Sequence, residues 1–70
     1  MSASKIIKQL LIEREMSVKD LADKLEVLPQ SMSNKLYRDS LSFSEMVKIA
    51  NLLNCDVKVI TRDSAKEFMQ

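Results

Sequence analysis

Residues 17–37 have the sequence SVKDLADKLEVLPQSMSNKLY, which indicates two short helices joined by a tight corner. Ser17 precedes Asp20 by three residues, which is a capping-box pattern and indicates the start of a helix. The apolar stripe that follows at helical spacing consists of Leu21, Ala22 and Leu25. The stretch therefore begins with a short amphipathic helix that is expected to end near residue 25.

A second helix is expected directly after the first. Pro29 has no N–H to leave unpaired at the first position of a helix, so it marks a helix start. Met32 and Leu36 continue an apolar face to about residue 37, and Val27 and Met32 are expected to face the core. Because only about three residues separate the two helices, the chain must turn a tight corner between them.

Two further helices are expected to flank this pair. One spans about residues 5–14, with Ser4 as its cap and with apolar positions at Ile6, Ile7, Leu10 and Leu11. The other is opened by a second capping box, Ser42 and Glu45, and has apolar positions at Phe43, Met46, Ile49, Ala50 and Leu53. Asn54 is expected to end it, because Asn tolerates the left-handed conformation and the chain contains no Gly.

After Cys55 the apolar period changes from helical to alternating. Val57, Val59 and Thr61 alternate with their neighbours and are β-branched, which favours a strand, and residues 66–69 can form a weaker returning strand. The expected fold is mainly α, with four helices and a C-terminal β-hairpin or strand. We expect one domain over residues 1–70, with a helical part over about 4–54 and a β extension over about 56–69.

Composition excludes several classes of function. With one Cys and no His in 70 residues, neither an internal disulfide nor the usual zinc patterns can form. No apolar stretch approaches the roughly 20 residues that span a bilayer, so we expect a cytoplasmic chain without a membrane partner. The chain has no Gly-rich phosphate loop and no His, and it is too small to enclose a dry active site. We therefore expect no enzyme, no catalytic residues, no metal and no cofactor.

The second helix of the corner has polar chemistry suited to DNA. The helix is locally basic, because residues 27–38 contain Lys35 and Arg38 but no Asp or Glu. The net charge of the whole chain is only +1. Gln and Asn can make paired hydrogen bonds to adenine, while Ser can bond base edges or phosphate. The second helix of a helix-turn-helix enters the major groove, and the first crosses the backbone. The predicted DNA-binding residues are Ser17, Lys19, Gln30, Ser31, Ser33, Asn34, Lys35 and Arg38.

The chain resembles the lambda-repressor/Cro-like (XRE-type) helix-turn-helix family of bacterial and phage transcriptional regulators over about residues 5–54. The segments that carry the resemblance are residues 21–25, Val27, residues 30–36 and residues 48–53. The resemblance implies a DNA-binding domain of four to five helices, usually dimeric, that reads a palindromic operator with its third helix. It also implies that Gln30, Ser31 and Asn34 occupy the family's base-contacting positions.

Five positions depart from that family. Glu26 stands where the corner commonly has Gly, which implies strain of about 1 kcal/mol if its φ is positive. Leu28 and Pro29 replace a hydroxyl cap and a polar residue. Val18 replaces a Gln that often contacts phosphate, and Lys35 replaces an apolar or aromatic residue.

Two functions remain open. The first is a sequence-specific DNA-binding transcriptional regulator, a repressor, which reads the major groove of a double-stranded operator with the helix at about residues 29–37. It would act as a homodimer, and pairing through the C-terminal strand is our hypothesis for its interface. The alternative is a protein-interaction module, such as an antitoxin or anti-repressor, on the same helices. Steep salt dependence of DNA binding would distinguish the first from the second.

Overall fold

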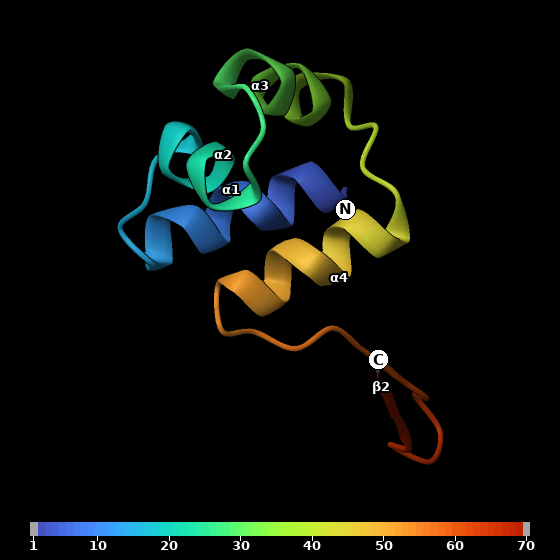
Figure 1. Ribbon diagram of the computed structural model, residues 1–70. Coiled ribbons are helices and arrows are strands. Elements are labelled where there is room, and N and C mark those ends of the chain that lie inside the picture. Colours follow the sequence, from blue (N-terminus) through green and yellow to red (C-terminus); the bar gives the residue numbers. More distant parts are fainter. Residues whose placement is uncertain (1, 70) are drawn as a thin grey trace.

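The computed structural model describes residues 2–69 and contains four helices followed by a β-hairpin (Figure 1). The elements are α1 (Ala3–Glu13), α2 (Val18–Leu25), α3 (Pro29–Arg38), α4 (Phe43–Leu52), β1 (Lys58–Ile60) and β2 (Glu67–Met69). This arrangement confirms the expected fold class, four helices with a C-terminal hairpin. None of the helices in residues 2–69 is long and apolar enough to cross a membrane.

Serine caps begin three of the helices. Both predicted capping boxes form, at Ser17 with Asp20 and at Ser42 with Glu45, since each Ser hydroxyl accepts the amide of the third helical residue. The predicted cap of α1 is wrong: Ser2 is the cap, with its Oγ accepting the Lys5 amide at 3.1 Å. Ser4 lies inside the first turn instead, buried, so α1 starts two residues earlier than predicted.

Helix ends and turns use the left-handed conformation at non-glycine residues. Within the described chain, positive φ occurs at Glu15, Glu26, Asp39, Asn54 and Ala65. Asn54 follows the end of α4 as predicted, with φ of 61°. Because the sequence has no Gly, each of these positions carries a Cβ in a region that glycine occupies without steric cost.

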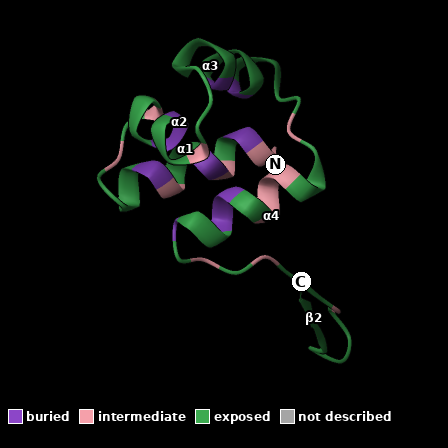
Figure 2. Cartoon of the chain, viewed as in Figure 1, coloured by how far each residue is buried: buried purple, intermediate pink, exposed green. Residues whose placement is uncertain are grey.

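The core lies where the four helices meet, and Figure 2 shows the buried residues on their inner faces. The buried cluster consists of Ile7, Leu11, Leu21, Ala22, Met32, Leu36, Ile49 and Leu53. Phe43, an apolar position of α4, is 56% exposed, because it begins the helix whereas the buried residues of that helix lie in its second half. The prediction that Val27 faces the core is wrong. Val27 is 44% exposed, because it lies in the corner after the left-handed Glu26.

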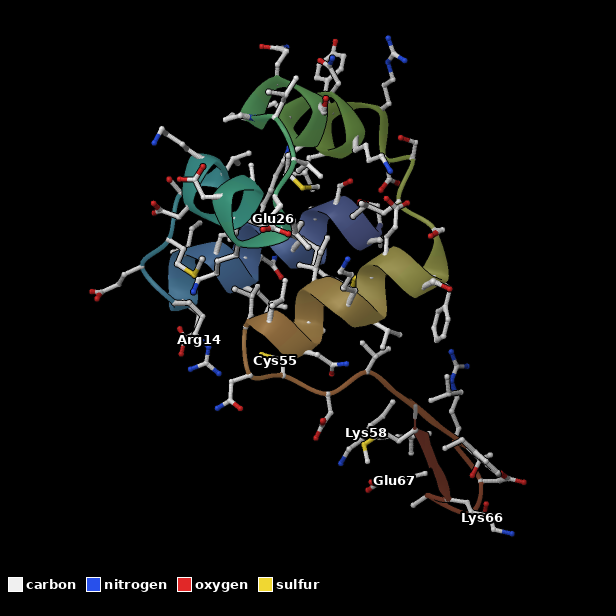
Figure 3. All side chains as sticks on the ribbon, viewed as in Figure 1. Arg14, Glu26, Cys55, Lys58, Lys66 and Glu67 are labelled. Atoms are coloured by element: carbon white, nitrogen blue, oxygen red, sulfur yellow. The ribbon has the colours of Figure 1, made fainter. Side chains whose placement is uncertain are left out.

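Arg14 joins the end of α1 to the end of α4 (Figure 3). Its Nε donates to the Leu53 carbonyl at 2.9 Å, and its guanidinium also reaches the Asn54 carbonyl and the Cys55 sulfur. The carbonyls at the C-terminus of a helix lack helical partners and carry partial negative charge, so a guanidinium stabilises them. This contact fixes the point at which the chain leaves the helices for the hairpin.

The hairpin extends away from the helices rather than packing on them (Figure 1). The two strands are antiparallel, with Val59 opposite Phe68, and all six strand residues are exposed. The turn between them follows Thr61, whose amide donates to the Lys66 carbonyl at 3.0 Å. Within the described residues the helices therefore leave both strands exposed.

Candidate nucleic-acid interface

The corner between α2 and α3 is closed by backbone hydrogen bonds around Glu26. Glu26 has φ 58° and ψ 40°, its amide donates to the Asp23 carbonyl, and the Val27 amide donates to the Ala22 carbonyl at 3.0 Å. The corner therefore has the left-handed geometry for which Gly is the usual choice, and the strain of about 1 kcal/mol is tolerated. The Glu26 side chain is exposed, so its carboxylate remains in water and no cost of burying a charge is added to the backbone strain.

Small and aliphatic side chains hold α3 on α2. Ala22 is fully buried and belongs to the same cluster as Leu21, Met32 and Leu36. A side chain without atoms beyond Cβ lets two helices approach closely, whereas a larger one would separate them. Since Met32 and Leu36 lie one turn apart, their burial directs the opposite face of α3 to solvent.

The predicted polar residues of α3 are all exposed: Gln30, Ser31, Ser33, Asn34, Lys35 and Arg38. Gln30 Nε2 donates to Asn34 Oδ1 at 3.1 Å, so the two amides form one pair along the helix. This bond leaves the Gln30 oxygen as an acceptor and the Asn34 nitrogen as a donor. Adenine presents the complementary N6 donor and N7 acceptor in the major groove.

The start of α3 is apolar. Leu28 is the N-cap, in an extended conformation and without a side-chain cap hydrogen bond, and Pro29 follows in the first turn. Leu28 is 71% exposed and Tyr37, in the last turn, is 88% exposed. The helix therefore presents apolar surface at its N-cap, amides on its first two turns, and a phenol beside Arg38 at its end.

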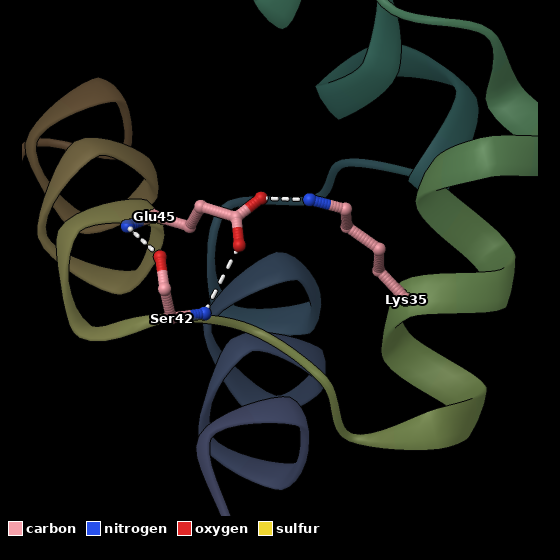
Figure 4. A network of polar contacts seen from close by, with 3 residues as sticks. All are labelled: Lys35, Ser42 and Glu45. Atoms are coloured by element: carbon pink, nitrogen blue, oxygen red, sulfur yellow. Dashed lines mark hydrogen bonds and ion pairs between the residues drawn. The ribbon is translucent and has the colours of Figure 1, made fainter.

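Lys35 lies on the flank of α3 that faces α4, and its ammonium contacts the Glu45 carboxylate (Figure 4). Glu45 also accepts the Ser42 amide at 3.0 Å as part of the α4 capping box. The Lys35 hydrogen bond, followed by the Ser42 amide, lowers the pKa of Glu45, so this carboxylate is ionised at neutral pH. A cation predicted to contact phosphate therefore has a carboxylate partner in the free protein.

Sequence reasoning did not identify Glu45 as part of this surface. Its position three residues after Ser42 indicated a helix cap, and that role is present. Nothing local could show that Lys35, ten residues earlier, would reach the same carboxylate, because the contact depends on how α3 packs beside α4.

The predicted positions on α2 lie at its N-terminus. The Ser17 hydroxyl accepts the Asp20 amide at 3.1 Å, and its hydrogen is still available to a phosphate oxygen. The Ser17 amide donates to the Asp20 carboxylate at 2.9 Å and thereby lowers the pKa of Asp20. Lys19 Nζ lies 3.6 Å from the Asp23 carboxylate.

Arg38, the last residue of α3, makes no ion pair with any residue in 2–69. Arg38 is thus the cation of this surface with no paired carboxylate among the described residues.

A small groove lies between α3 and α4, next to the Lys35 contact. It has a volume of about 140 Å³, and its apolar lining comes from Leu25, Val27, Met32 and Ile49. Ser31 and Lys35 also line the groove, whereas the Gln30 and Asn34 amides do not.

Two helices joined by a short corner, with the second presenting an acid-free polar face, define the helix-turn-helix class of DNA-binding protein. Comparison with known protein families matches residues 6–60 to the Cro/C1-type HTH DNA-binding domain, and the chain belongs to this family. The family is one of DNA-binding regulators rather than enzymes. Neither the curated proteins nor the solved structures contain a match to this chain.

Proposed function

We propose that the chain is a sequence-specific transcriptional repressor that reads the major groove with α3. The observation that carries the proposal is the Gln30–Asn34 amide pair, exposed on the first two turns of a helix whose opposite face is buried. A paired amide has fewer rotamers to lose when it binds, so its donor and acceptor meet an adenine edge with less entropic cost. Family membership supports the choice of DNA as the partner.

The other predicted residues divide by position. Ser31 and Ser33 flank the amide pair and are proposed to contact base edges or the nearby backbone, as hydroxyls can do both. The residues proposed to contact phosphate are Ser17, Lys19, Lys35 and Arg38. Lys35 must leave Glu45 to make this contact, whereas Arg38 needs no such exchange with a described residue. Arg38 should therefore contribute more to phosphate binding than Lys35.

We further propose that two copies bind a palindromic operator whose half-sites lie about one helical turn apart. The copies would act in the cytoplasm and repress by occupying the site.

Selection of bound sequences from random DNA at defined salt tests this function. Enrichment of a palindrome is expected, and a reporter with that palindrome between promoter and gene should lose expression when the protein is present. Asn34→Ala should weaken binding to the selected site by about 1–3 kcal/mol with little effect on random DNA. Arg38→Ala is the matched control, because it should weaken both and reduce the salt slope by about one. Equal loss on both DNAs for Asn34→Ala would contradict base reading.

The alternative remains a protein-interaction module such as an antitoxin or anti-repressor. The groove between α3 and α4 favours it, since an apolar side chain of a partner can occupy a cavity of about 140 Å³. Absence of any enriched sequence would support this alternative over the repressor.

A further inference from the structure

The C-terminal end of α3 is tied to the start of α1. Asp39, which follows the last residue of α3, accepts the Ser4 amide through Oδ1 at 3.1 Å. Ser4 lies in the first turn of α1, is 4% exposed, and is 35 positions away along the chain. Amides in the first turn of a helix lack helical partners, so Asp39 supplies α1 with a cap from another element. This bond lowers the pKa of Asp39, so the acceptor is an ionised carboxylate and the bond is charge-assisted.

Asp39 keeps this position at a steric cost. Its φ of 53° and ψ of 46° lie in the left-handed region, which Gly occupies without penalty. Asp tolerates this conformation better than most residues do, but it still carries a Cβ there. A Gly would form the turn with less strain and could not reach Ser4. The turn alone therefore favours Gly, whereas the tie to α1 requires an acceptor side chain.

Few polar contacts hold this end of α3 on the other helices. Among the described residues, side-chain hydrogen bonds join α3 and its C-cap to α1 and α4 at two points, Asp39 with Ser4 and Lys35 with Glu45. The second contact is exposed, and the proposed function requires Lys35 to leave Glu45 for a phosphate. Packing of Leu36 in the core keeps α3 close to the other helices, but a hydrogen bond also restricts its direction. In the DNA complex the Asp39 bond is then the polar tie that remains.

Arg38 stands directly before Asp39 in the chain. It is exposed and makes no ion pair with any described residue, including its neighbour. Since adjacent residues share one backbone, a contact that fixes Asp39 also fixes the point from which the Arg38 side chain starts. An arginine loses conformational freedom when it binds, and a fixed backbone leaves less freedom to lose.

We propose that Asp39 is a positioning residue for DNA binding, whose bond to Ser4 holds the C-terminal end of α3 so that Arg38 meets a phosphate. The inference rests on the proposed function, because it takes Arg38 as a phosphate contact. It differs in sign from the effect of charge alone. A carboxylate beside a DNA-binding surface repels phosphate, so its removal would by itself tighten binding.

Two substitutions at Asp39 separate position from charge. Affinity varies with salt concentration to a power of about −0.9 per phosphate contact, so one contact is worth about eightfold at 0.1 M salt relative to 1 M. Asp39→Gly removes the tie and should weaken binding to random DNA about twofold to fivefold, which is part of that value. Asp39→Asn removes the charge but keeps an oxygen for the Ser4 amide, so it should bind at least as tightly as the wild type.

Ser2→Ala is the matched control. It removes the other side-chain cap of α1, the bond from the Lys5 amide to Ser2 Oγ, and does not alter a contact of α3. It should leave DNA affinity unchanged, with circular dichroism used to confirm that every variant is folded at the assay temperature. Weakening by Ser2→Ala equal to that by Asp39→Gly would overturn the proposal, because the loss would then follow from destabilised α1. Binding by Asp39→Gly that is unchanged or tighter, or binding by Asp39→Asn that is equally weak, would overturn it as well.

A double-mutant cycle tests the route through Arg38. Arg38→Ala should weaken binding to random DNA less in the Asp39→Gly background than in the wild type. The same loss in both backgrounds would refute positioning of Arg38. If Arg38→Ala leaves the affinity and salt slope of the wild type unchanged, the proposed phosphate contact fails and this inference fails with it. If Arg38→Ala acts as expected and Asp39→Gly does not weaken binding, only the role of Asp39 is refuted.

Discussion

Replacement of Glu45 by Gln should tighten DNA binding. In the free protein the Glu45 carboxylate holds the Lys35 ammonium, and the two side chains retain exposed fractions of 36% and 46%. Water screens an ion pair at this exposure, so the contact is worth about 0.2–1 kcal/mol. Lys35 must give up this free energy when it moves to a phosphate. Gln keeps the oxygen that accepts the Ser42 amide, so the α4 cap should survive while the competing charge is lost.

The expected gain is about 1.4-fold to 5-fold in affinity for each half-site, on random as well as selected DNA, because phosphate contacts carry no sequence information. Fluorescence anisotropy with a labelled duplex between about 50 and 200 mM salt measures it. Glu45→Gln, Lys35→Ala and the double variant form a double-mutant cycle with the wild type. Lys35→Ala should cost more in the Glu45→Gln background than in the wild type.

Two outcomes would refute this reasoning. If Glu45→Gln leaves the affinity unchanged, Lys35 does not compete between carboxylate and phosphate. If the double variant keeps the full gain, the effect comes from the general loss of a negative charge rather than from release of Lys35. Ser42→Ala serves as the control for helix capping, because it should lower stability by about 1 kcal/mol without tightening DNA binding.

Two further predictions concern stability. Glu26→Gly should raise the free energy of unfolding by about 0.5–1 kcal/mol, because Gly relieves the left-handed strain. Glu26→Ala, the control, should not raise it, and urea unfolding measures both variants. Equal effects would show that the gain comes from loss of the negative charge and not from relief of strain. Hydrogen bonds hold the pKa of Asp20 and of Asp39 below the ordinary 3.8, and that of Glu45 below 4.5. Their stabilisation is therefore fully present above those ordinary values and is lost as pH falls through the lowered pKa values. Asp39→Asn, which removes the carboxylate that accepts the Ser4 amide, should reduce this acid dependence in circular-dichroism titrations; an unchanged profile would contradict the assignment.

Much of the candidate site follows from local chemistry. The Ser17 and Ser42 capping boxes, the Pro29 helix start and the exposed polar residues of α3 depend on side chains within one turn of each other, so their pattern predicts them. Asn34 and Gln30 are also four residues apart on one helix, and their hydrogen bond needs no tertiary contact. The cap of α1 was misassigned because two serines, at positions 2 and 4, compete for the same local role.

Most helix starts, the corner and the polar chemistry of α3 can be predicted from the amino-acid sequence, because these depend on neighbours along the chain. Three features could not be predicted in this way: the contact of Lys35 with Glu45, the contact of Arg14 with the end of α4, and the exposure of Val59 and Phe68 on a hairpin apart from the helices. These features depend on where separate elements lie relative to one another. A periodic pattern shows which face of a helix or strand is apolar, but not what covers that face or which charge lies beside it.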